Sequence, residues 1–216
     1  MTALAVITIC LIILILLPNI YPQHHYGVKI RDLNPGDLIL TNCNNVPDRL
    51  VRLLTNAPFS HVLMINRIVP RGPNLPPDIY GIQCTSAAIT GDGEYDVNEV
   101  LLTLPMLYRW SSQTWIMRAR DIYDKFVPVN PADYQHIKFD LLASFKNHSG
   151  DKQNCITFII LILKKYGAQI PPVYNRGDFR ALIDMAVDNQ MFFKPELLYQ
   201  RNETFSLSYL RRFFFL

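Results

Sequence analysis

The chain has 216 residues and a formal net charge of +3; half of its residues are hydrophobic and 18% are charged. This balance excludes a disordered chain, because low hydrophobicity and high charge are what keep a chain unfolded. The small positive charge is spread along the sequence and forms no basic stripe, so we expect no nucleic-acid partner. The length is sufficient for one domain with a sizeable core.

The N-terminal segment predicts a membrane anchor. Residues 3–17 are almost unbroken aliphatic, and the run counted through Tyr21 reaches the roughly 20 residues that span a bilayer. A cleaved signal peptide is the alternative, but no Lys or Arg precedes the run and no Ala-x-Ala site follows it. We therefore expect one N-terminal transmembrane helix over residues 1–21, followed by a linker over residues 22–33.

The charges around this segment favour one topology. Lys29 and Arg31 follow the apolar run and nothing basic precedes it, which by the positive-inside rule places the domain in the cytosol. The sequons at Asn147 and Asn202 would be glycosylation sites if the domain were luminal. We expect a single-pass membrane protein with a cytosolic domain, and a secreted enzyme with a signal peptide is the alternative.

The cysteines indicate working thiols and no disulfide framework. Outside the membrane segment lie Cys43, Cys84 and Cys155, an odd number that suits a reducing compartment. These three and His61 have no CxxC or HxxxH spacing, so we expect no metal site. The chain also lacks a glycine-rich phosphate loop, and we expect no cofactor.

The first half of the domain predicts a mainly antiparallel sheet or an open barrel. In chain order we expect a turn at residues 34–37, a strand at 38–41, a short helix at 47–54, a strand at 61–65, a proline-rich loop at 70–77, and strands at 80–85, 97–104 and 114–118.

The second half predicts helices packed against that sheet, so the fold class is α+β. We expect helices over residues 131–146, 155–166 and 178–188, and an aromatic and basic tail over residues 206–216 that either docks on the core or lies at a membrane interface. The domain itself is expected to span residues 34–205.

The most informative pair of residues is Asn154 and Cys155, at the start of a long apolar helix that Gly167 closes. A cysteine in the first turn of a helix lies in the positive end of the backbone dipole, which stabilises a thiolate. His61 lies far upstream and, if it reaches the sulfur, supplies the base of a cysteine nucleophile. The alternative is that Cys155 is a small buried apolar residue.

The order of these elements resembles a known group. Gly36 and Asp37 precede a strand, Ser-His-Val at His61 opens the next strand, a polar residue follows on the third, and Asn-Cys-x-x-Phe-Ile heads a late helix. This order is similar to the circularly permuted papain-like group, the NlpC-like superfamily that includes YiiX-type hydrolases and lecithin:retinol acyltransferase-like enzymes. The resemblance covers roughly residues 33–200 and implies a circularly permuted papain-like fold.

The resemblance also implies site residues. Cys155 would be the nucleophile, and His61 would be its base and then the acid that protonates the leaving group. The third polar position falls on Gln83, where YiiX-type relatives usually have an acid and acyltransferase-like ones a second histidine. A glutamine carbonyl orients the imidazole but stabilises the imidazolium less than a carboxylate does. An outward-facing strand residue is the alternative for Gln83.

Three further residues are expected to have supporting roles. Asp37 is expected to hold the turn before the first strand. Arg118, at the end of a strand, resembles a recurring arginine of the group, and we assign it no role. Asn154 is expected to cap the helix, and the backbone N–H of Cys155 is the expected oxyanion donor.

The sequence thus predicts a membrane-anchored thiol hydrolase or acyltransferase that attacks an amide, ester or thioester through Cys155. The expected partners are the membrane and a lipid, lipidated protein or peptide substrate, and the sequence does not decide among these substrates. The alternative is an anchored interaction or structural module of the same fold, catalytically weak or inactive, in which the glutamine at position 83 marks lost activity.

Overall fold

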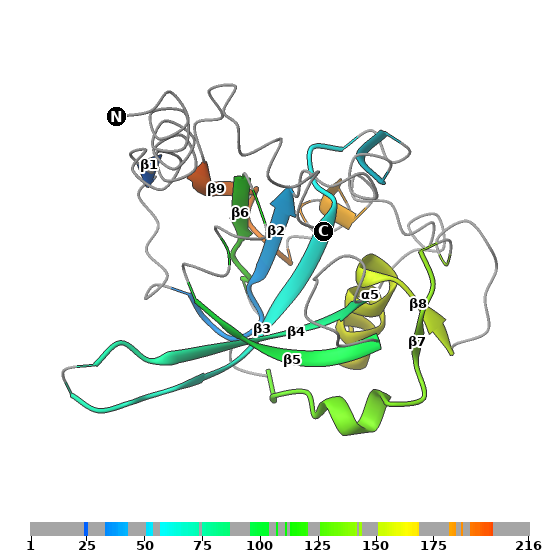
Figure 1. The fold of residues 1–216 in the computed structure, drawn as a ribbon, viewed down its shortest axis with the longest axis horizontal. Coiled ribbons are helices and arrows are strands. Elements are labelled where there is room, and N and C mark those ends of the chain that lie inside the picture. Colours follow the sequence, from blue (N-terminus) through cyan, green and yellow to red (C-terminus); the bar gives the residue numbers. More distant parts are fainter. Residues whose placement is uncertain are drawn as a thin grey trace, which may run out of the picture.

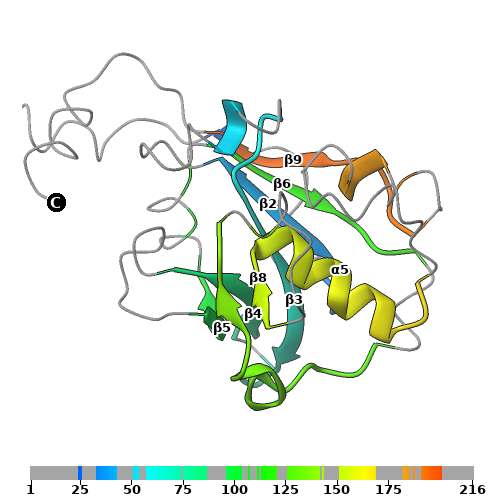
Figure 2. The same ribbon diagram turned by 90° about the vertical axis from the view of Figure 1, so that its right-hand side faces the viewer.

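The computed structural model describes part of the chain, and all statements below concern that part: residues 24–25, 33–42, 51–53, 57–73, 75–86, 96–103, 107, 111, 113–120, 126–141, 143, 151–168, 182–184, 187 and 191–200. The fold is α+β with a mostly antiparallel sheet, which confirms the predicted class at this level. Figure 1 shows the sheet and Figure 2 shows the helix α5 lying across it.

The main sheet has seven strands in the order β1-β9-β6-β2-β3-β4-β5, and each of its strand pairings is antiparallel. Its strands are β1 (His24–His25), β2 (Leu38–Asn42), β3 (His61–Val69), β4 (Asp78–Thr85), β5 (Asp96–Leu102), β6 (Gln113–Met117) and β9 (Glu196–Gln200). β2 to β6 confirm the five predicted strands. β9, which separates β1 from β6, was not predicted.

A tight turn sets the start of β2. Gly36 has φ 90, in the left-handed region that glycine adopts readily. Asp37 is fully buried, and its carboxylate accepts N–H groups from Asn34 at 2.9 Å and from Ala119 at 3.0 Å. The carboxylate therefore ties the turn to the chain that leaves β6, which confirms the structural role predicted for Asp37.

The sheet buries both of its faces, so β2 is buried at every position. One face, which we call the α5 face, carries Leu38, Leu40, Val62, Met64, Ile82 and Cys84, in one cluster with the apolar residues of α5. The second face carries Ile39, Leu63, Ile65, Ile79, Leu102 and Ile116. The alternation follows from the two-residue period of a strand.

Asn66 anchors a second segment at an irregularity in β3. The β3–β4 register shifts between Ile65 and Arg67, which leaves Asn66 at the shift. Its amide nitrogen donates to the carbonyl of Val129 at 2.9 Å, and its carbonyl accepts the N–H of Val129 at 2.7 Å. The buried Asn66 side chain therefore holds the chain that leads into the helical half as another strand would.

The segment after Asn130 corrects one prediction. Residues 131–146 were predicted to form a helix, but Pro131–Tyr134 is a single turn of 3₁₀-helix (η4) and Lys138–Phe139 is a short strand (β7). β7 pairs in parallel with β8 (Lys152–Gln153), and the carboxylate of Asp96 accepts the N–H of Phe139 at 2.8 Å. These tertiary hydrogen bonds outweigh the helical pattern of the sequence.

The predicted apolar helix is confirmed as α5 (Cys155–Lys165). Seven of its residues are buried against the α5 face, including Phe158, which meets Tyr134 edge to face at 5.5 Å. At its end Gly167 has φ 85 and donates to Lys164, while the N–H of Ala168 reaches Leu163. This Schellman arrangement satisfies the last carbonyl groups of the helix.

Other predicted elements lie wholly or partly outside the described residues. Of the helix at 47–54 only residues 51–53 are described, as helix, and Leu53 there is 79% exposed. Of the helix at 178–188, residues 182–184 and 187 are helical. Residues 1–21, most of the linker, and the tail at 206–216 are not described. Among the described helices none is long and apolar enough to cross a membrane.

Candidate active site

His61 and Gln83, two of the predicted site residues, are in direct contact. His61 is the first residue of β3 and Gln83 lies near the end of the neighbouring β4. The Nε2 atom of the imidazole and the Oε1 atom of the amide are 2.7 Å apart, and both side chains are buried. Gln83 is therefore a buried strand residue that faces the histidine, and the alternative of an outward-facing residue is wrong.

This hydrogen bond defines the tautomer of His61. A carbonyl oxygen only accepts hydrogen bonds, so Nε2 must carry the proton and Nδ1 must carry the lone pair, given this orientation of the amide. An imidazole oriented by a partner at Nε2 presents Nδ1 as its basic atom. The geometry is that of a base held in place by a third residue.

The charge of His61 is set mainly by burial. Burial lowers the pKa of His61 from 6.5 to about 4, and the hydrogen bond that His61 donates to Gln83 opposes this only in part. The imidazole is therefore neutral at pH 7 and able to accept a proton. Gln83 is uncharged and supplies no countercharge to an imidazolium, unlike a carboxylate at the same position.

Cys155 is the first residue of α5 and is 7% exposed. Asn154 caps the helix as predicted: its side-chain oxygen accepts the N–H groups of Ile156 and Thr157, both at 3.0 Å. The Oγ1 atom of Thr157 in turn accepts the N–H of Asn154 at 2.9 Å. This capping box fixes the first turn of α5 and the backbone that carries the thiol.

The chain leading into α5 lies against the end of β4. The thiol of Cys84 donates to the carbonyl of Gln153 at 3.6 Å. The pKa of Cys84 is raised, first by burial and then by the negative charges of Cys155 and Asp96. Cys84 and Cys155 are therefore neighbouring buried thiols, and the start of α5 lies at the end of the β3–β4 pair that also carries His61 and Gln83.

Gln83 and Cys84 leave β4 on opposite faces of the sheet, because consecutive strand residues alternate. Cys84 belongs to the α5 face, whereas Gln83 shares its face with Gly81, whose added Cβ would meet Leu63 of the second face. The structure thus brings His61 to Gln83 and Cys155 to Cys84. Since His61 is the first residue of β3, its ring can reach Cys155 only around the end of that strand.

Two buried polar atoms beside His61 lack hydrogen-bond partners, namely Nε2 of Gln83 and Oγ1 of Thr85. Thr85 follows Gln83 by two residues in β4, so both project from the same face, and both are fully buried. Sequence reasoning missed Thr85. The signal for it was the alternation of polar and apolar residues at the end of β4, which marks a polar patch on one face.

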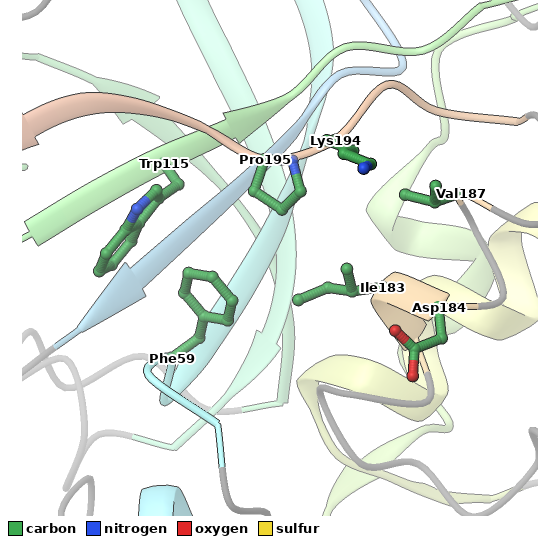
Figure 3. Close-up of a pocket in the computed structure, with 7 residues that line it drawn as sticks. All are labelled: Phe59, Trp115, Ile183, Asp184, Val187, Lys194 and Pro195. Carbon is green, nitrogen blue, oxygen red and sulfur yellow. The ribbon is translucent and has the colours of Figure 1, made fainter.

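A pocket of about 460 Å³ lies on the α5 face, opposite to the face of His61 and Gln83, because Trp115 in its wall pairs with Leu40 of the α5 face. Figure 3 shows Phe59 and Trp115 on one side of it and Asp184, Val187 and Lys194 on the other, with Ile183 and Pro195 between them. Phe59 precedes His61 by two residues and meets Trp115 edge to face at 4.7 Å. No sequence motif marked these residues, because the pocket joins segments far apart in the chain.

The remaining candidate residues have other places. The carbonyl of Arg118 accepts the N–H of Phe193 at 2.8 Å, next to the bridge between Ala119 and Phe192. His136 is exposed, and His24 and His25 form β1. Cys43 and His148 lie outside the described residues. Within the described ranges no group of three or more metal-ligating side chains comes together.

The chain matches no protein-family model and no curated protein sequence. What bears on function is therefore the contact between His61 and Gln83, the place of Cys155 at the start of α5, and the order of these residues in the chain.

Proposed function

We propose that the protein is a cysteine hydrolase or acyltransferase of the circularly permuted papain-like fold, with Cys155 as nucleophile and His61 as base. The observation that carries this proposal is the 2.7 Å hydrogen bond between Nε2 of His61 and Oε1 of Gln83, at the end of the sheet where α5 begins. This bond directs the basic Nδ1 atom away from Gln83, as a base that serves a nearby thiol requires.

The proposed reaction begins with attack on an ester, thioester or amide. Nδ1 of His61 takes the proton of the Cys155 thiol as the sulfur forms a bond to the carbonyl carbon. The negative charge that develops on the carbonyl oxygen is stabilised by the backbone N–H of Cys155 and by the positive end of α5. The tetrahedral intermediate collapses, the leaving group departs with the proton from His61, and an acyl group remains on Cys155.

The second half of the reaction regenerates the thiol. Water, or the hydroxyl or amine of an acceptor, gives its proton to His61 and attacks the acyl carbonyl. The bond between sulfur and carbon breaks, Cys155 recovers its proton from His61, and the acid or the new acyl product leaves. Because the imidazole is neutral at pH 7, the proton moves during attack, and no preformed ion pair is needed.

The substrate-trapping test uses the full chain with acyl nitrophenyl esters, acyl thioesters and acyl amides. We expect one of these classes to acylate Cys155, detected as the acyl mass on its peptide. Cys155→Ala abolishes the adduct, and His61→Ala lowers its rate by roughly 10²-fold or more. His136→Ala is the matched control, because it removes an imidazole that is exposed, whereas that of His61 is buried. An adduct rate that His61→Ala leaves unchanged would contradict the proposal.

The localisation belongs to the same proposal. Residues 1–21 would anchor the domain in a membrane, with the domain in the cytosol, and this would hold the site within reach of a lipid or a lipidated protein. Membrane fractionation of the full chain, and of a chain starting at residue 22, tests this. The anchor predicts that only the full chain resists extraction at high pH, and equal extraction of the two would contradict it.

One observation favours the second candidate, a non-catalytic anchored module. His61 is 3% exposed, Cys155 is 7% exposed, and the third residue is an uncharged glutamine. A buried, neutral histidine–glutamine pair also occurs where a polar pair only stabilises a fold. The module predicts that Cys155→Ala keeps the biological activity of the protein, whereas the enzyme predicts that it is lost.

A further inference from the structure

The ends of β3 and β4 separate beside His61. β3 begins at His61 and β4 ends at Thr85, but among the described residues the pairing of the two strands stops at Met64 and Ile82. Toward this end β3 stays paired with β2 and β4 with β5, and Figure 1 shows the two pairs diverging. The side-chain hydrogen bond between His61 and Gln83 therefore spans an opening between strand ends.

Two polar atoms at this opening have no partner in the protein. The Oε1 atom of Gln83 accepts a hydrogen bond from His61, whereas its Nε2 atom is buried and meets no acceptor in the described part of the chain. The Oγ1 atom of Thr85 is likewise buried without a partner, and both side chains are 0% exposed. Buried polar atoms left unpaired destabilise a fold, so we expect a polar molecule to contact both atoms.

The spacing of the two atoms suits a single bridging oxygen. Gln83 and Thr85 lie two residues apart on the same face of β4, which separates their Cα atoms by roughly 6.6 Å. An oxygen about 2.8 Å from each partner spans up to about 5.6 Å, and the longer glutamine side chain covers the remainder. Asn98 lies opposite Gln83 on β5, so a third polar side chain is on this face. Buried waters typically make about three hydrogen bonds.

The surroundings favour a small neutral molecule over an ion. The NH₂ group of Gln83 is a donor, which disfavours a cation. A buried anion would need a positive charge beside it, and His61 is neutral at pH 7 because burial lowers its pKa to about 4. A larger ligand would have to displace side chains that are 0% exposed.

We propose that a water molecule is bound between the ends of β3 and β4, where it accepts a hydrogen bond from Nε2 of Gln83 and bonds to Oγ1 of Thr85. Thr85 is then a positioning residue, because it acts through the water to hold the amide of Gln83 against His61. This inference holds whether or not Cys155 reacts, so its tests measure no activity.

NMR spectroscopy of the full chain detects the water directly. A water that stays bound longer than the protein tumbles gives nuclear Overhauser cross-peaks to nearby protons, and their sign in the rotating frame separates them from proton exchange. We expect such a cross-peak to the side-chain NH₂ of Gln83, which is assigned by its loss in Gln83→Ala. The cross-peak should also be lost in Thr85→Val. Absence of the cross-peak in the parent would overturn the proposal.

The stability of Thr85→Val gives a test that depends on a sign. Valine keeps the shape of threonine but lacks the hydroxyl. If the hydroxyl binds the water, we expect the thermal midpoint to fall by roughly 2–4 °C, whereas removal of an unpartnered hydroxyl would raise it. Thr114→Val is the matched control, since Thr114 is 0% exposed and its hydroxyl bonds to that of Ser111 at 2.7 Å; its midpoint should also fall. An unchanged or higher midpoint for Thr85→Val would contradict the bound water.

The positioning role has its own measurement, the solvent exchange of the ring proton on Nε2 of His61. A buried, hydrogen-bonded ring proton exchanges slowly, and we expect this in the parent and in Thr85→Ser, which keeps the hydroxyl. Thr85→Val should exchange faster. Thr114→Val should keep the parent rate despite its lower stability, because β2 separates β6 from β3. Equal exchange rates in the Thr85→Val and Thr114→Val proteins would overturn the positioning role.

Discussion

Gln83 and Cys84 are consecutive residues of β4, and each is in contact with a different half of the candidate site. Gln83 accepts a hydrogen bond from His61, while Cys84 donates to Gln153 and lies beside Cys155. One strand end therefore contacts both His61 and the chain that begins α5, on opposite faces of the sheet. A displacement of this strand end would move both halves together.

The charge at position 83 should control the charge of His61. In Gln83→Glu a carboxylate faces Nε2 and favours the imidazolium, so we expect the pKa of His61 to rise by roughly 1–3 units from its value of about 4. An NMR titration of the His61 ring protons measures this. Gln135→Glu adds the same charge at an exposed position and should leave the titration unchanged. An equal shift in both variants would mean that the Gln83 contact does not govern His61.

Burial of His61 should make the protein less stable in mild acid. The pKa is 6.5 in the unfolded chain and about 4 in the folded one, so between these pH values the unfolded state binds more protons. Above pH 6.5 His61 is neutral in both states and its protonation costs the folded protein nothing. As the pH falls to 4, protonation of His61 in the unfolded state lowers the free energy of unfolding by roughly 3 kcal/mol. Denaturant titrations of the full chain at several pH values measure it.

The control for this acid effect compares how steeply the free energy of unfolding falls with pH in variants and parent. His61→Leu removes the titrating group, so its stability should fall less between pH 6.5 and pH 4 than that of the parent. His136→Gln, at an exposed position, should keep the slope of the parent. If His61→Leu and the parent have the same slope, the imidazole titrates normally in the folded state and the burial argument is wrong.

The buried carboxylate of Asp37 should be important for stability. Asp37→Ala leaves the buried N–H of Ala119 and the part-buried N–H of Asn34 without their acceptor, and a buried unpaired donor costs about 1–3 kcal/mol. We expect a loss of about 3 kcal/mol in the free energy of unfolding. Denaturant unfolding measures it, with Asp133→Ala on the exposed side of η4 as control. A loss as small as that of the control would show that water replaces the carboxylate.

Capping of α5 should contribute separately. Asn154→Ala removes the acceptor of the N–H groups of Ile156 and Thr157, and we expect a loss of about 1 kcal/mol. Asn154→Asp keeps the acceptor and adds a negative charge at the positive end of the helix, so it should match or exceed the parent in stability. Thermal unfolding of the three proteins gives the order of their stabilities. An Asn154→Ala protein as stable as the parent would contradict the capping role of Asn154.

Local patterns predicted much of the fold. The turn at Asp37, β2 to β6 and α5 all have signals within a few residues: a glycine turn, short β-branched runs, and an apolar helix with a capping asparagine and a closing glycine. Of the candidate site, the contact between His61 and Gln83 was expected from the resemblance, and the cap at Asn154 from its position before the helix.

The elements that sequence reasoning missed depend on distant partners. Residues 131–146 have a helical pattern, but the Asp96 carboxylate and the pairing with β8 turn Lys138–Phe139 into a strand. β9 forms a strand because it pairs with the free edge of β6 through antiparallel backbone hydrogen bonds. The pocket joins Phe59, Trp115 and Ile183 from three separate segments, so no window of the sequence contains it.

The position of β9 has a consequence for how the chain is made. β9 is the last strand of the described residues, yet it lies beside β6 in the interior of the sheet order. β1, the first described strand, pairs with its other side. A nascent chain that has not yet emerged past Gln200 leaves the edge of β6 unpaired while the strands on the other side are complete. Exposed strand edges pair readily with other chains, so we expect the pairing of β9 to protect the edge of β6 from aggregation at the end of synthesis.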